Sequence, residues 1–179
     1  ADLLEAAGVS LELNPSQVSD CIENVGLGFM YAPGHHSAMK HVIGPRKEIA
    51  HKSIFNILGP LTNPASTPNQ VMGVYDKKWM KPVAEVHQSL GSKNVMVVHS
   101  EDNLDEISIA SKTKVVELRE GKISEYVISP EEFGLEFHSL DGLKVNSPEE
   151  SLSMAKKALK GEHSAASSMV ALNAGAALY

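Results

Sequence analysis

This sequence has little cysteine, few aromatic residues and no long hydrophobic run. Cys21 is the single cysteine among 179 residues, so an internal disulfide framework is excluded and a reducing compartment is expected. No apolar stretch approaches the roughly 20 residues of a membrane-spanning helix, and the first residues lack the basic region and apolar core of a signal peptide. These absences predict a cytoplasmic protein with no membrane partner.

Basic residues are not in excess either. The 16 Lys and Arg residues face 22 Asp and Glu residues, which gives a formal net charge of -6. Nucleic-acid binding usually requires a basic patch, so no nucleic acid is expected as a partner. The sequence also lacks a GxGxxG motif and a Walker-type phosphate loop. What it does have is 42% hydrophobic residues, enough for one domain with a sizeable core.

Hydrophobic periodicity predicts a strand, a helix and a second strand in the middle of the chain. The strands are QVMGVY (70–75) and NVMVVH (94–99), and residues 80–90 carry apolar side chains at helical spacing. Short connections make this a βαβ unit with parallel strands. Alternating patterns predict antiparallel strands further along, at 107–110, 113–118 and 122–128, with a hairpin turn at Glu120-Gly121.

Helices are predicted on both sides of this region. Asn14 and Pro15 open one that closes at Gly26, before a short strand at 27–31. Two more follow Ser147 and Ser164 near the end of the sequence. The predicted fold class is α/β, with a central mixed, mainly parallel sheet flanked by helices and part of a small helical domain.

The segment 29–65 has the densest set of residues suited to binding. It combines adjacent histidines, an arginine after a Gly-Pro turn and the run NILGPLTNP. Gly and Pro fix the backbone shape there, and glycine amides can donate to an anion. The polar groups suited to a small anionic ligand are His36, Arg46, Asn56 and Asn63.

Each of these residues also has an ordinary structural interpretation. Arg46 could hold a carboxylate in a bidentate pair, or it could pair with Glu48 or solvent at the surface. One of His35 and His36 could bind a ligand, or it could satisfy a backbone carbonyl. Zinc is not indicated, because Cys21 and the histidines lack ligand spacing.

Asp105 and Glu106 follow the predicted strand 94–99 by a short loop. Sheets of α/β proteins place ligands at the carboxyl ends of their strands. Two neighbouring carboxylates can hold Mg²⁺ together with substrate phosphates and water. Adjacent acids are also common in loops, so a solvated pair is the alternative. As a metal pair, they indicate chemistry on a phosphorylated substrate.

These motifs resemble those of the nucleoside phosphorylase/phosphoribosyltransferase family, and in particular the anthranilate phosphoribosyltransferases. The matching pieces are APGHHSAMK, the arginine ten residues after its second histidine, SIFNILGPLTNPA, QVMGVY and VVHSEDNLDEIS. The resemblance continues through to ALNAGAALY at the end of the chain. Pyrimidine nucleoside phosphorylases share part of the IFN-x-LGP-x-x-NP pattern and are the alternative enzyme. A homologous binding module without catalysis is the non-enzymatic alternative.

The resemblance implies a reaction and roles for particular residues. The phosphoribosyl group of phosphoribosyl pyrophosphate would pass to the amine of anthranilate, releasing pyrophosphate, as a step of tryptophan biosynthesis. His36 and Arg46 would face anthranilate, with Arg46 at its carboxylate, and Gly59 would line the same channel. Asp105 and Glu106 would hold Mg²⁺ on the pyrophosphate. No residue is assigned as an acid or a base.

The resemblance also predicts what lies outside this sequence. The family's Gly-rich GTGGD loop, its KHGN segment and most of its small helical domain would precede Ala1. Residues 1–179 are therefore expected to be the C-terminal α/β domain of a longer, homodimeric enzyme, with 34–52 packing against the helical domain. Because half of the phosphate site would be missing, the chain by itself is expected to be inactive.

Overall fold

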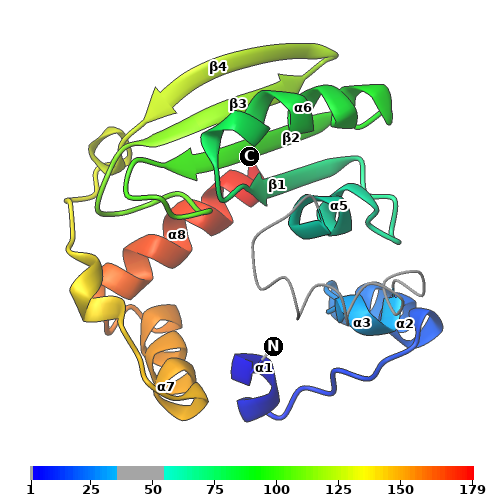
Figure 1. Cartoon of the computed structure of the whole chain (residues 1–179). Helices are drawn as coiled ribbons and strands as arrows, with labels where there is room; N and C mark the ends of the chain where they lie inside the picture. Colours follow the sequence, from blue (N-terminus) through cyan, green and yellow to red (C-terminus); the bar gives the residue numbers. More distant parts are fainter. Residues whose placement is uncertain (1, 36–54) are drawn as a thin grey trace. The chain divides into compact units, whose positions relative to one another are not determined.

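The computed structural model describes residues 2–35 and 55–179, which belong to two compact units (Figure 1). The first unit comprises residues 1–64 and 147–152, and the second comprises 65–146 and 153–179. None of the helices in the described residues is long and apolar enough to cross a membrane.

The described part of the first unit is helical. Its helices are α1 (Asp2–Ala6), α2 (Pro15–Val25), α3 (Ala32–His35) and α5 (Phe55–Leu61), joined by the start of α7 (Pro148–Leu159).

Helix α2 has the ends that its sequence predicted. The Asn14 side chain accepts from the Gln17 amide at 3.0 Å, and the Gln17 side chain accepts from the Asn14 amide at 2.9 Å. This capping box satisfies two of the amides that a helix start leaves unpaired. Gly26 ends the helix at φ 86°.

The strand predicted at 27–31 is wrong. A strand needs a hydrogen-bonded neighbour, and no strand pairs with this segment among the described residues. Instead, Gly28 lies against α2, where a Cβ atom would come within 2.8 Å of the Val18 side chain. The apolar residues here follow a helix at close range rather than joining a sheet.

A four-stranded mixed sheet forms the centre of the second unit, in the order β1-β2-β3-β4. The strands are β1 (Asn69–Gly73), β2 (Asn94–Ser100), β3 (Thr113–Arg119) and β4 (Lys122–Ile128). Helix α6 (Met80–Ser89), after the short 3-10 helix η2 (Lys77–Trp79), connects the parallel strands β1 and β2. The α/β fold and the mixed sheet are confirmed. Parallel pairing is not predominant among the described strands, because β3 pairs antiparallel with both β2 and β4.

Helices cover both faces of this sheet (Figure 1). Helix α6 packs on β2 and β3, and α8 (Ser164–Leu178) lies on the other face. Val98 and Val115 are register partners and share a core with Leu172 of α8. Because successive strand residues point to opposite faces, their neighbours Val97 and Val116 face α6.

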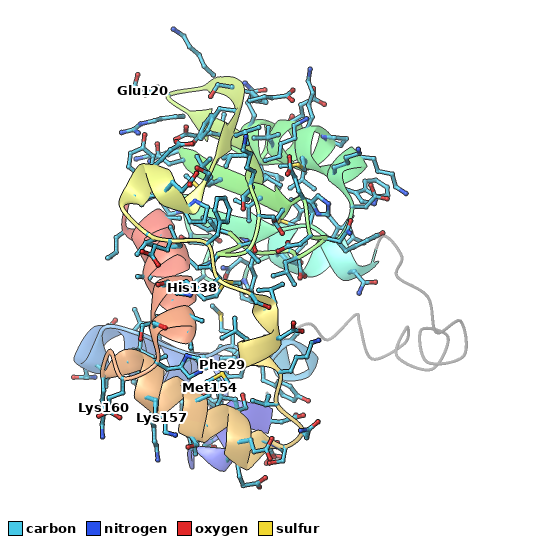
Figure 2. The ribbon with its side chains drawn as sticks, turned by 90° about the vertical axis from the view of Figure 1, so that its left-hand side faces the viewer. Phe29, Glu120, His138, Met154, Lys157 and Lys160 are labelled. Atoms are coloured by element: carbon cyan, nitrogen blue, oxygen red, sulfur yellow. The ribbon has the colours of Figure 1, made fainter. Side chains whose placement is uncertain are left out.

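The β3-β4 hairpin turns where the sequence predicted. Figure 2 shows Glu120 at the tip of the hairpin. Glu120 and Gly121 have φ values of 50° and 73°, the left-handed pair that a two-residue hairpin turn requires. After β4 come two 3-10 helices, η3 (Pro130–Phe133) and η4 (Leu140–Leu143), and then α7, which ends at Leu159.

Residues 107–110 do not form the strand that their alternating pattern predicted. Ile107 and Ile109 are buried in the core that includes α8. No strand pairs with their backbone among the described residues. The Ser108 amide donates to Oγ1 of Thr113 at 3.1 Å, and the Ile109 carbonyl accepts from the His138 amide at 2.9 Å. The alternation therefore marks two buried anchors of a loop.

Candidate functional site

The predicted metal pair lies in the loop between β2 and β3, which we call the acidic loop (residues 101–112). Asp105 and Glu106 line a cavity of about 320 Å³. Its other lining residues come from β1, β2 and α8, and they are Val71, Gly73, Val98, Met169, Val170 and Asn173. The cavity thus reaches the carboxyl end of β1, where α/β sheets characteristically bind ligands.

Asp105 lies directly against the last residue of β1. A Cβ atom built on Gly73 would be 1.5 Å from the carbonyl oxygen of Asp105 and 2.5 Å from its carbonyl carbon. No side chain fits in that space, so glycine is required for the loop to lie where it does. An isolated glycine inside a strand typically marks such a close approach.

Backbone anchors hold the chain on both sides of the pair. Before it, the Ser100 amide donates to the Leu104 carbonyl at 3.0 Å, and the Leu104 amide donates to Oγ of Ser100 at 3.1 Å. After it, the Ile107 amide donates to Oδ1 of Asn173 at 3.0 Å, and Nδ2 of Asn173 donates to the Ile107 carbonyl at 2.9 Å. Asp105 and Glu106 therefore sit between two fixed points.

Asp102 lies near the pair in sequence, but its carboxylate is used inside the loop. It accepts from Oγ of Ser100 and, at 2.5 Å, from Oγ of Ser108. Burial raises the pKa of Asp102, but hydrogen bonds from Ser100, Ser108 and the Leu104 amide lower it more, so the pKa lies below its ordinary value of 3.8. This carboxylate therefore braces the acidic loop from within.

The donor set fits a hard divalent cation. Burial raises the pKa of Glu106, and the neighbouring negative charge of Asp105 raises it further. A cation placed beside both carboxylates would relieve that repulsion and favour their ionised forms. In the described part of the chain, no group of three or more His, Cys, Asp or Glu side chains could hold a metal. Mg²⁺ suits a site with two protein carboxylates, because it keeps several waters and takes substrate phosphates as further ligands.

The other predicted site residues fall elsewhere. His36 and Arg46 lie outside the described residues. Gly59 lies in α5 of the first unit, and the space where its Cβ would stand is open. Its carbonyl accepts from the Thr62 amide at 3.1 Å. Asp105 and Glu106 belong to the second unit.

Sequence reasoning missed the residues that support the acidic pair. Gly73 carried a usable signal, because a glycine within QVMGVY is unusual in a buried strand. Asn173 is a polar residue in the apolar helix SAASSMVALNAGAAL, which also indicates a specific partner. The partners of Ser100 and Ser108 had no such signal, because serines are common in loops.

These features define an α/β domain with a candidate cation site at the carboxyl end of a parallel strand. Residues 1–179 match the glycosyl transferase family, a/b domain, and the chain belongs to this family. It is 58% identical over 179 residues to an anthranilate phosphoribosyltransferase of Hydrogenovibrio crunogenus. The match covers 100% of this chain and 53% of that relative. The chain spans about half the length of the curated relatives that it matches.

Solved structures are similar over nearly the whole chain. The anthranilate phosphoribosyltransferase of Thermus thermophilus superposes with a TM-score of 0.89 at 43% identity, over 99% of this chain and 53% of that one. The Saccharomyces cerevisiae enzyme in complex with phosphoribosyl pyrophosphate and Mg superposes with a TM-score of 0.86 at 28% identity, over 96% of this chain and 50% of that one. The resemblance inferred from the sequence motifs is confirmed.

Proposed function

We propose that this chain is the C-terminal α/β domain of an anthranilate phosphoribosyltransferase. The observation that carries the proposal is the family match together with the Asp105-Glu106 pair at the carboxyl end of β1. Curated relatives with this name match the whole chain. The Saccharomyces cerevisiae enzyme of this name, similar over 96% of the chain, was solved with phosphoribosyl pyrophosphate and Mg. The proposed partners are anthranilate and phosphoribosyl pyrophosphate, and the enzyme is proposed to act in the cytoplasm as a homodimer.

The proposed reaction forms one carbon-nitrogen bond and breaks one carbon-oxygen bond. The anthranilate amine attacks the anomeric carbon of the ribose, pyrophosphate leaves with the bonding electrons, and the nitrogen loses a proton. An aromatic amine is a modest nucleophile, so positioning and stabilisation of the departing charge carry the catalysis. We assign no residue as an acid or a base in this reaction.

Asp105 and Glu106 are the residues that would hold Mg²⁺. Both residues line one cavity, and the raised pKa of Glu106 fits a group that gains from a nearby cation. When bound, Mg²⁺ would offset the negative charge that collects on the leaving pyrophosphate. We propose that His36, Arg46 and Gly59 serve the anthranilate side, with Arg46 meeting the carboxylate as a bidentate donor.

The proposal is tested by comparing substrates with the longer enzyme that would carry this chain. We expect product from anthranilate and phosphoribosyl pyrophosphate, detected by mass spectrometry, and none from uridine or thymidine with phosphate. Asp105→Asn should raise the Mg²⁺ concentration needed for half-maximal rate by about tenfold or more, because one of two carboxylate ligands is lost. Phosphorolysis of the nucleosides without phosphoribosyl transfer would instead identify a pyrimidine nucleoside phosphorylase.

The same assay tests whether transfer requires the part of the longer enzyme outside residues 1–179. The 179-residue chain alone should show little or no transfer. A rate close to that of the longer enzyme would contradict the domain assignment.

A further inference from the structure

The acidic pair is held without regular secondary structure. Asp105 and Glu106 lie in a loop, where side chains and backbone ordinarily have more freedom than in a strand or helix. A site that must hold a cation needs both carboxylates at a fixed separation and direction. Contacts from outside the acidic loop must therefore supply the rigidity.

Asn173 of α8 binds both polar groups of the residue that follows the pair. Its Oδ1 accepts from the Ile107 amide at 3.0 Å, and its Nδ2 donates to the Ile107 carbonyl at 2.9 Å and to the Met169 carbonyl at 3.0 Å. All of its strong hydrogen-bonding groups are engaged. Two bonds to one residue fix the orientation of that residue as well as its position.

Gly73 fixes the pair from the opposite direction. The Asp105 carbonyl oxygen occupies the space where a Cβ of Gly73 would stand, at 1.5 Å from it. An alanine there would force the backbone of Asp105 away from β1. Gly73, Asp105, Glu106 and Asn173 all line the same cavity.

We propose that Asn173 and Gly73 are positioning residues that set the divalent-cation affinity of the Asp105-Glu106 pair. The inference rests on the proposed function for the identity of the cation. Asn173 clamps the backbone next to Glu106, and Gly73 allows Asp105 to lie against β1. Outer residues that orient metal ligands typically change metal affinity by about 10- to 100-fold when they are lost.

The test measures Mn²⁺ binding directly, so it does not depend on activity. Mn²⁺ is titrated into the longer enzyme without pyrophosphate, which would itself chelate the ion, and free Mn²⁺ is read from its electron paramagnetic resonance signal. Asn173→Ala and Gly73→Ala should each weaken Mn²⁺ binding by about tenfold or more.

Two controls separate positioning from general loss of stability. Gly175→Ala adds the same methyl group on α8, where nothing beyond the adjoining residues of the helix lies within 4 Å of the new Cβ, so Mn²⁺ binding should stay within about twofold. Leu118→Ala empties a fully buried position on the sheet face that α6 covers. It should lower stability and leave Mn²⁺ affinity unchanged. Circular dichroism verifies that each variant is folded.

The inference is overturned if a folded Asn173→Ala or Gly73→Ala enzyme binds Mn²⁺ within about twofold of the unsubstituted protein, or if Leu118→Ala weakens binding as much. Should neither variant fold, hydrogen exchange of the unsubstituted enzyme decides. The Ile107 amide should exchange more slowly with Mn²⁺ and pyrophosphate, and an unchanged rate would refute the clamp. An enzyme that binds Mn²⁺ through this clamp but transfers no phosphoribosyl group would refute the proposed function alone.

Discussion

Replacing Asp102 tests whether this acid braces the acidic loop rather than binding a ligand. The perturbation is Asp102→Ala. It removes the carboxylate that accepts from Oγ of Ser100 and, at 2.5 Å, from Oγ of Ser108. It also removes a longer contact of 3.5 Å to the Leu104 amide.

The expected loss of stability depends on which acceptors remain for the two serine hydroxyls. Oγ of Ser100 keeps an alternative acceptor, the Leu104 carbonyl at 3.1 Å, so its loss is partial. Oγ of Ser108 accepts from the Ala110 amide at 2.9 Å but loses its acceptor when Asp102 is removed. A hydrogen bond to a charged group contributes about 1.5–3 kcal/mol, so one full loss and one partial loss predict about 2–4 kcal/mol of destabilisation.

Urea unfolding of the longer enzyme, followed by circular dichroism at pH 7, measures this loss. Asp102→Asn keeps one acceptor oxygen and should lose less. The exposed Asp141→Ala is the matched control, because its partner Lys144 lies at the surface, and it should leave the midpoint unchanged. Since the pKa of Asp102 is lowered on folding, its stabilisation is present above pH 3.8 and disappears as the pH falls through the lowered value. If Asp102→Ala destabilises the enzyme by less than about 0.5 kcal/mol, Asp102 does not brace the acidic loop.

Three further predictions concern the sheet and α6. Burial lowers the pKa of His87 below 6.5, so the unfolded chain binds more protons than the folded chain as the pH falls. The urea midpoint should therefore drop from pH 7.5 to pH 5.5, and His87→Gln should make that drop smaller. Leu118→Ala, at a site with 0% exposure, should cost about 2–5 kcal/mol in the same assay, whereas Val127→Ala at 51% exposure should change stability by less than about 0.5 kcal/mol. Glu120→Asn should raise the melting temperature, because Asn tolerates φ 50° better than Glu; an unchanged or lower value would contradict the turn assignment.

Local patterns predicted the elements whose ends and faces are set by neighbouring residues. The ends of α2 and the Glu120-Gly121 turn depend on a few adjacent side chains, and the elements of the βαβ unit each show their own hydrophobic periodicity. The predictions were wrong where residues far away in the sequence determine the local structure. Residues 27–31 have strand composition but no strand beside them in the described chain, and 107–110 alternate because two isoleucines are buried under a helix far along the sequence.

The sequence predicted the candidate metal ligands, but not the residues that hold those ligands in place. Adjacent carboxylates after a buried strand indicate a cation site from sequence alone, since the chemistry is local. The clamp by Asn173 joins residues 66 positions apart, and the contact with Gly73 depends on how the acidic loop folds back onto β1. Neither contact has a local pattern that specifies its partner.

The most direct test of the central claim is anthranilate fluorescence over time with the longer enzyme, Mg²⁺ and phosphoribosyl pyrophosphate. We predict a loss of fluorescence that requires both additions and is abolished or greatly slowed by Arg46→Ala, since Arg46 is proposed to hold the anthranilate carboxylate. Fluorescence that stays constant with the intact enzyme and both additions would contradict the proposed transferase activity.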